Sequence, residues 1–130
     1  PRYMGLLIPH HYEHHVLRKP AAEWPDAVNR AFAAINPSIY VPIQGPSELG
    51  AGGVLLTWDR TDDLERIMVP TLVIAAQHDT MDPEFMRMMS GRLPRGSFLL
   101  CENGSHMTMY DDPEPYFAGL LGFLKDVDRR

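Results

Sequence analysis

Two titratable side chains, Asp79 and His106, each follow a short apolar run of the sequence. The runs are residues 71–75, which are rich in β-branched side chains, and Phe98–Cys101. Runs of this kind, without polar alternation, are typical of strands covered on both faces of a parallel sheet. The carboxyl ends of parallel strands share one edge of the sheet, where ligands and catalytic groups gather. We therefore expect Asp79 and His106 to meet at that edge.

An acid and a histidine in this arrangement can act as a pair. The carboxylate of Asp79 would accept a hydrogen bond from the imidazole of His106, fix its tautomer and stabilise the imidazolium. Such a pair supplies two of the three side chains of a nucleophilic triad. A lone loop Asp or His usually has no catalytic role, so the prediction depends on the pairing. Asp82 is a competing acid, although its position directly before Pro83 favours a helix N-cap.

Two nearby side chains could act as the nucleophile and need weighing. Cys101 ends the second apolar run shortly before His106, so a Cys–His nucleophilic pair is one interpretation. A lone cysteine in an apolar run is more often a buried small hydrophobe. Ser105 lies in Gly-Ser-His-Met and lacks the second glycine of a Gly-x-Ser-x-Gly elbow. We therefore assign the nucleophile to neither residue.

The elements around these residues alternate between strand and helix, which predicts an α/β fold with a mostly parallel sheet. Asn36-Pro37 is interpreted as the end of a helix. Residues 35–53, dense in proline and glycine, are predicted to form a loop. The predicted helices are residues 3–16, interrupted at Pro9, and residues 24–35, 83–89 and 113–127.

A run of histidines lies within the first predicted helix. His10, Glu13 and His14 fit the His-x-x-Glu-His pattern of one class of zinc enzymes, and the spacing of His11 and His15 could also present two imidazoles to a metal. Pro9 disturbs the helix immediately before this run, and no partner helix supplies a recognisable third ligand. A solvated polar face of a lid is the commoner role for such a run, and contact with a substrate is the remaining alternative.

Several motifs together resemble a known family. They are Trp-Asp-Arg-Thr at 58–61, Val-Pro-Thr-Leu-Val-Ile at 69–74, Asp-Thr-Met-Asp-Pro at 79–83, Gly-Ser-His at 104–106 and Gly-Pro-Ser-Glu at 45–48. In this combination they strongly resemble the C-terminal half of proline iminopeptidases (prolyl aminopeptidases) and their amino-acid amidase relatives, which are α/β-hydrolases. The order of acid before histidine also fits that superfamily. The resemblance covers essentially the whole sequence.

The resemblance implies a role for particular residues. It matches the catalytic acid of the family to Asp79 and the catalytic histidine to His106. Acidic residues of the cap hold the free α-amino group of the substrate in that family, which points to Glu48 and, less securely, to Glu13. An exposed loop carboxylate is the alternative role of Glu48. The resemblance also implies that residues 1–53 are cap and cap-to-core junction, and that residues 54–130 are the C-terminal portion of the hydrolase core.

The function implied by the resemblance is hydrolysis of an N-terminal residue, foremost proline, from a peptide or amide with a free N-terminus. The serine nucleophile and the oxyanion hole of the family precede the matched part, so we expect the chain to be a fragment that is inactive alone. It would act with the N-terminal half of the hydrolase, in the same precursor or in a second chain. Another α/β-hydrolase (an amino-acid amidase, esterase or epoxide hydrolase) and a non-enzymatic metal-binding or partner-binding module are the alternatives. We expect no cofactor.

The amino-acid composition bears on the partners and the location of the protein. The 130 residues are 45% hydrophobic and 22% charged, with a formal net charge of −5. This acidic balance, with basic residues interspersed, disfavours nucleic acid as a partner. No apolar run approaches the length of a membrane span, so we expect no membrane association. The single cysteine excludes an internal disulfide and agrees with a reducing, cytoplasmic location.

Overall fold

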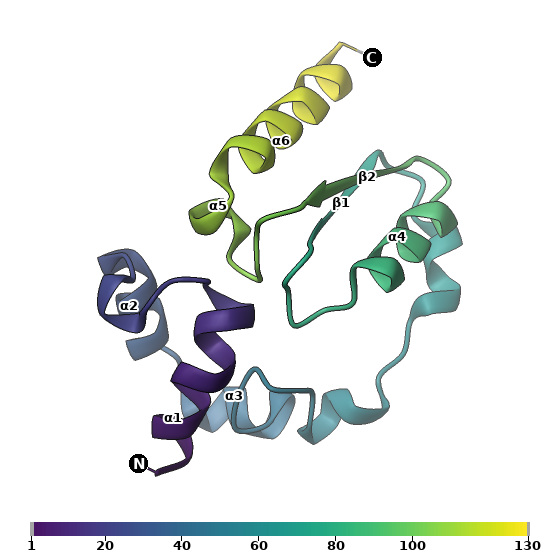
Figure 1. Cartoon of the computed structure of the whole chain (residues 1–130). Coiled ribbons are helices and arrows are strands. Elements are labelled where there is room, and N and C mark those ends of the chain that lie inside the picture. Colours follow the sequence, from purple (N-terminus) through teal and green to yellow (C-terminus); the bar gives the residue numbers. More distant parts are fainter. Residues whose placement is uncertain (1, 130) are drawn as a thin grey trace.

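The computed structural model describes residues 2–129 and has a helical N-terminal part followed by a strand–helix–strand unit (Figure 1). The N-terminal part contains α1 (Arg2–Leu7), the π-helix η1 (Ile8–Val16), η2 (Ala21–Glu23), α2 (Asp26–Ala33), α3 (Pro37–Gln44), η3 (Gly53–Thr57) and η4 (Thr61–Arg66). The remainder contains β1 (Thr71–Ala76), α4 (Pro83–Arg92), β2 (Gly96–Cys101), α5 (Thr108–Asp111) and α6 (Pro113–Asp128).

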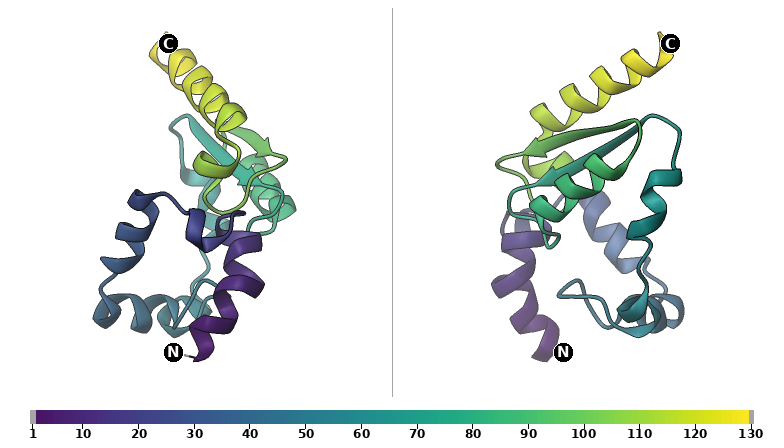
Figure 2. Two further views of the ribbon diagram at one scale, coloured as in Figure 1. Left: turned by 60° about the vertical axis from the view of Figure 1, so that its left-hand side comes forward. Right: turned by 90° about the vertical axis from the view of Figure 1, so that its right-hand side faces the viewer.

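The two strands lie side by side in parallel. Thr71 of β1 is opposite Gly96 of β2, and Ala76 is opposite Cys101. Helix α4 makes the crossover between the strands, and α6 lies on the other side of the sheet (Figure 2). The carboxyl-terminal ends of the strands are their most buried parts. The predicted strands, their parallel pairing and the α/β class are thereby confirmed.

The helices from α1 to α3 are called the cap below. Helix α1 continues directly as η1. Pro9 is at the start of η1, where a missing N–H is tolerated, so the chain restarts as a wider helix. Leu7, Tyr12 and Val16 form a small apolar core. Trp24, Phe32 and Met107 are among the partly buried side chains that pack against it. Because Met107 follows His106, the cap core and the loop after β2 share one packing unit.

Helix α3 corrects the prediction that residues 35–53 form a loop. Asn36 caps α3, since its side chain accepts a hydrogen bond from Ser38 N at 3.0 Å. Pro37 follows as the first helical residue, where its fixed φ suits a helix start. Asn36-Pro37 therefore lies between two helices and begins the second. The helix ends at Gln44 and is followed by Gly45, whose φ of 103° few other residues adopt.

The described helices extend past the expected boundary between cap and core. That boundary, between residues 53 and 54, falls within η3, and helical turns continue to Arg66 before β1 begins. The division into 1–53 and 54–130 stays a prediction. No helix within residues 2–129 has the length and apolar character that a membrane span needs.

Gly104 allows the loop after β2 to pass close to α5. A Cβ at this position would lie 2.1 Å from Thr108 Oγ1 and 2.8 Å from Thr108 Cβ. Rotation of the threonine cannot remove the second contact, because Cβ is fixed by the backbone. The close approach therefore requires glycine two residues before His106.

We expect Gly104→Ala to lower the free energy of unfolding by about 1–3 kcal/mol, as overpacking of a well-filled site does. Gly122→Ala is the matched control, because a Cβ there meets nothing within 4 Å in the interior of α6. The control should be neutral or stabilising by up to about 1 kcal/mol. Urea unfolding of the two variants checks this, and equal unfolding free energies would contradict the close approach.

Candidate active site

The loops after the two strands continue the pairing of the sheet. Gln77 N–H donates to Cys101 O at 3.0 Å, and His78 N–H donates to Gly104 O at 3.0 Å. These bonds extend the parallel ladder beyond the last strand residues. Asp79 and His106 follow directly and so lie on adjacent loops at the carboxyl-terminal edge of the sheet.

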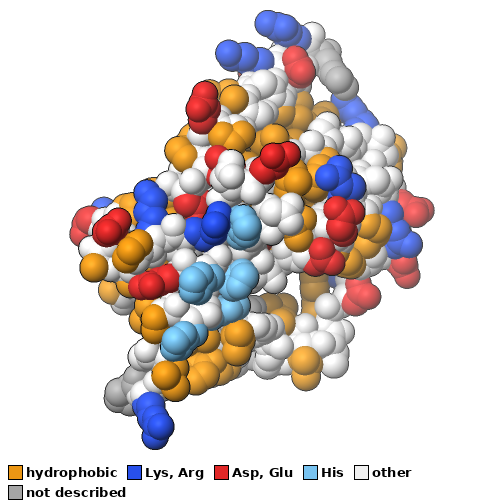
Figure 3. Space-filling model, in the orientation of Figure 1, with side chains coloured by type: hydrophobic (Ala, Val, Ile, Leu, Met, Phe, Trp, Pro, Cys, Tyr) orange, Lys and Arg blue, Asp and Glu red, His pale blue; other side chains and the backbone are white. Residues whose placement is uncertain are grey.

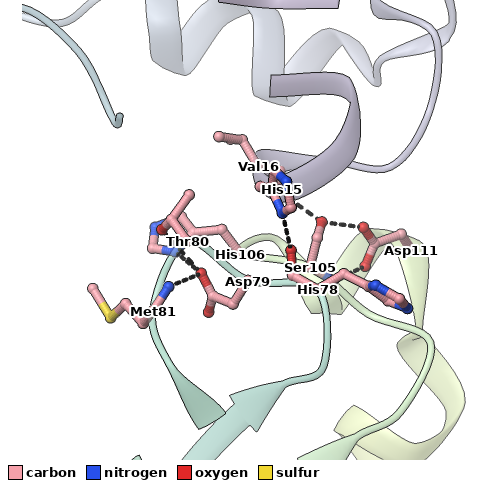
Figure 4. Close-up of polar contacts among 9 residues, drawn as sticks. All are labelled: His15, Val16, His78, Asp79, Thr80, Met81, Ser105, His106 and Asp111. Carbon is pink, nitrogen blue, oxygen red and sulfur yellow. Dashed lines mark hydrogen bonds and ion pairs between the residues drawn. The ribbon is translucent and has the colours of Figure 1, made fainter. Parts of the chain in front are cut away.

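Asp79 and His106 contact each other there (Figure 4). His106 Nδ1 lies 2.9 Å from Asp79 Oδ1. The same carboxylate oxygen accepts hydrogen bonds from Thr80 Oγ1 at 3.1 Å and Met81 N at 3.2 Å. A carboxylate can only accept, so Nδ1 of the neutral imidazole carries the proton. Nε2 is then the basic nitrogen that remains for another partner.

Burial and charge act on both members of the pair. The exposed fraction of the side chain is 11% for Asp79 and 32% for His106. Burial works to raise the pKa of Asp79, but the hydrogen bond and charge of His106, with the Met81 and Thr80 donors, hold this pKa below its usual value. The Asp79 hydrogen bond raises the pKa of His106 against the opposing effect of burial, and the charges of Asp79 and Glu48 raise it further. The pair therefore favours carboxylate and imidazolium.

His106 faces a cavity of about 190 Å³ between the cap and the strand loops. Its lining is mainly apolar and includes Val16, Phe32 and Met107. Glu48 lines this cavity as well and also a second, larger one of about 470 Å³ within the cap. The structure thus brings Glu48 to the same space as His106.

Two tyrosines hold Glu48 in place. The Tyr40 hydroxyl donates to the Glu48 carboxylate, and Glu48 N–H donates to Tyr12 Oη at 3.0 Å. Burial and the hydrogen bond to Glu48 raise the pKa of Tyr40, so its hydroxyl keeps its proton. Neither tyrosine was singled out from the sequence. Tyr12 is far from Glu48 along the chain, and Tyr40 belongs to α3, the helix that the sequence did not predict.

Glu13, the second acidic residue considered for the substrate amine, is not brought to this site. Its carboxylate accepts a hydrogen bond from Ala21 N at 2.7 Å and so joins η1 to η2. It is absent from the linings of both cavities that Glu48 lines. The structure therefore gives Glu13 a role within the cap, and of the two acids considered for the substrate amine it brings only Glu48 to the cavity that His106 lines.

The histidine run gathers on one face of the molecule, over η1 (Figure 3). His10 and His14 are exposed there, as a solvated face would require. Among residues 2–129, no group of three or more His, Cys, Asp or Glu side chains is placed to hold a metal ion. The His-x-x-Glu-His pattern at residues 10–14 therefore forms no metal-binding cluster with the other described residues.

The other candidates from the sequence have structural partners. Asp82 is the N-cap of α4, with its side chain accepting from Glu84 N at 2.9 Å. Cys101 is fully buried, and burial raises the pKa of its thiol, which makes it a poor nucleophile. Ser105 is also fully buried, and its hydroxyl lies within hydrogen-bonding distance of Val16 O and the Asp111 carboxylate. None of the three faces the cavity beside His106.

The amino-acid sequence is similar to curated enzymes over nearly its whole length, although no family model matches it. A relative from Chitinophaga pinensis, named proline iminopeptidase, is 45% identical over 128 residues, which cover 98% of this chain and 43% of that protein. The proline iminopeptidase of Elizabethkingia meningoseptica is 44% identical over 132 residues, which cover 100% of this chain and 44% of that protein. The chain thus spans less than half the length of these curated relatives.

Two solved structures share the fold. The crystal structure of proline iminopeptidase from Mycobacterium smegmatis matches with a TM-score of 0.81 at 26% identity, over 98% of this chain and 46% of that one. The crystal structure of VinJ matches with a TM-score of 0.81 at 29% identity, over 89% of this chain and 39% of that one. By sequence and by fold, the chain is therefore homologous to the C-terminal part of proline iminopeptidases, within the α/β-hydrolase superfamily.

Proposed function

We propose that this chain supplies the acid and the base of a serine aminopeptidase that removes an N-terminal residue, foremost proline, from a peptide or amide. The observation that carries the proposal is the Asp79–His106 hydrogen bond at 2.9 Å, with Glu48 lining the cavity that His106 faces. The names of the relatives support the substrate class. A cytoplasmic location belongs to the same proposal, and the single cysteine, which suits a reducing compartment, supports it.

In the proposed mechanism, His106 Nε2 takes the proton of a serine hydroxyl that lies outside this chain as the serine attacks the substrate carbonyl. The Asp79 carboxylate stabilises the imidazolium that forms. His106 then gives the proton to the leaving amine, and an acyl-enzyme remains. In the second half of the reaction, His106 takes a proton from water as the water attacks the acyl-enzyme. His106 then returns this proton to the serine, and the amino acid is released. Glu48 and the apolar lining act on binding and do not exchange protons with the reacting carbonyl.

Glu48 gives the site its preference for a free amine. A substrate ammonium group can pair with its carboxylate, which the Tyr40 hydroxyl orients. The cavity lining around Glu48 includes Phe32 and Ile35, which suit an apolar ring such as pyrrolidine. An esterase or epoxide hydrolase would not need a carboxylate at this place, so Glu48 favours the aminopeptidase over those activities.

The role of Asp79 can be tested in the enzyme that includes this chain and its nucleophile. Asp79→Asn should lower kcat on a proline arylamide by about 10⁴-fold, as the equivalent change does in a serine protease triad, because the tautomer of His106 is no longer fixed. Asp82→Asn, which changes a helix cap, is the control and should retain most of the activity. Equal kcat values for the two variants would show that Asp79 is not the acid.

The role of Glu48 can be tested with two substrates that share a five-membered ring. Glu48→Gln should reduce kcat/KM for a proline arylamide, because the ammonium loses a partly desolvated partner. The reduction should correspond to a loss of about 2–5 kcal/mol of binding free energy. Turnover of p-nitrophenyl cyclopentanecarboxylate, which lacks the amine, should change little. An equal loss on both substrates would mean that Glu48 merely supports the loop.

The pH dependence follows from the pKa of His106. Neutral imidazole is the base, so kcat/KM should rise with pH through this pKa, and the inflection should lie above the ordinary histidine value of 6.5. Since the charge of Glu48 contributes to the raised pKa, Glu48→Gln should move the inflection to lower pH. The cyclopentanecarboxylate ester isolates the enzyme's titration from that of a substrate amine. An inflection at or below 6.5 in the unmodified enzyme would contradict this electrostatic picture.

A further inference from the structure

His15 lies where the cap meets both loops of the candidate active site (Figure 4). It is the penultimate residue of η1, and the last carbonyl groups of a helix have no partners within it. Here the sheet loops supply those partners. His106 N–H donates to His15 O at 3.0 Å, and Met107 N–H donates to Val16 O at 2.8 Å. The end of η1 thus fixes the backbone that carries His106.

The imidazole of His15 reaches the other loop. Its Nδ1 lies 3.0 Å from His78 O, the carbonyl that directly precedes Asp79. A carbonyl can only accept, so His15 Nδ1 carries a proton in this contact. The imidazolium also has a proton on Nδ1, so the contact persists when His15 is protonated. One residue therefore binds the His106 loop through its backbone and the Asp79 loop through its side chain.

These contacts close a ring of hydrogen bonds around the candidate catalytic pair. His15 joins the His106 backbone to His78, and the Asp79–His106 hydrogen bond completes the ring. His78 N–H stays bonded to Gly104 O, but loosening the contact between His15 and His78 would remove the restraint on the His78 carbonyl, so that Asp79 could shift relative to imidazole Nδ1. Misplacement of catalytic groups by about 1 Å can cost on the order of 10²-fold in rate.

We propose that His15 is a positioning residue for the Asp79–His106 pair, holding the two loops at the spacing that their hydrogen bond needs. This inference rests on the proposed function, because it takes the pair to be catalytic. It also accounts for one member of the histidine run that neither a metal cluster nor a solvated face explains. His14, its exposed neighbour on the same helix, makes no hydrogen bond to either loop within residues 2–129.

Two substitutions of similar size separate the hydrogen bond from packing. His15→Asn keeps an N–H donor near the place of Nδ1, and His15→Leu removes it. In the enzyme that includes this chain and its nucleophile, His15→Leu should lower kcat on a proline arylamide by on the order of 10²-fold with KM little changed. The inflection of its pH profile should also fall toward the ordinary histidine value, because the Asp79 contact that raises the pKa of His106 is loosened. His15→Asn should restore most of kcat and the inflection, and His14→Leu should match the unmodified enzyme.

The proposal is overturned if His15→Asn loses as much kcat as His15→Leu, or if neither differs from His14→Leu. A second measurement does not depend on any variant being folded. Nitrogen-15 NMR of the unmodified enzyme should show His15 protonated at Nδ1, and a neutral Nε2–H tautomer would also overturn the proposal. Retained activity in Asp79→Asn would instead refute the proposed function, while leaving the tautomer of His15 to report whether the contact exists.

Discussion

The parallel pairing of β1 with β2 is the interaction on which the candidate site depends. The ladder continues past the strands through Gln77 and His78, whose N–H groups donate to Cys101 and Gly104 carbonyls. Two loops of different sequence are thereby held side by side. The acceptor carbonyls belong to the buried residues Cys101 and Gly104, so separating the loops would leave buried acceptors unpaired. The Asp79–His106 contact is a consequence of this backbone arrangement.

Much of this arrangement could be predicted from local sequence, because the signals are local. Apolar runs identified both strands, and Asp82 before Pro83 identified a helix cap. Helix α3 was missed because Asn36-Pro37 is compatible with the end of one helix and the start of another. The contacts of Glu48 with Tyr12 and of His15 with His78 could not be predicted, because these hydrogen bonds join residues far apart in the chain. Such pairs leave no periodic pattern in a single sequence.

The cap and the sheet meet through polar contacts as well as through apolar packing. Met107 joins the cap core, while Ser105 and Asp111 form a partly buried polar contact beside it. Arg18 N–H also donates to the Asp111 carboxylate at 3.0 Å, so this acid joins the end of η1 to the loop after β2. Apolar contacts tolerate sliding, whereas directed hydrogen bonds to one carboxylate do not. The mixture fixes the position of the cap over His106.

The burial of Cys101 has a chemical consequence for the strand that ends beside the site. Its thiol is fully buried at the end of β2, and burial raises its pKa, so little thiolate is present at neutral pH. Oxidants attack the thiolate form, and they must also reach the sulfur. The folded sheet therefore shields its cysteine from sulfenic acid formation and from mixed disulfides. Oxidative stress should leave this edge of the sheet chemically unchanged for as long as the strands remain paired.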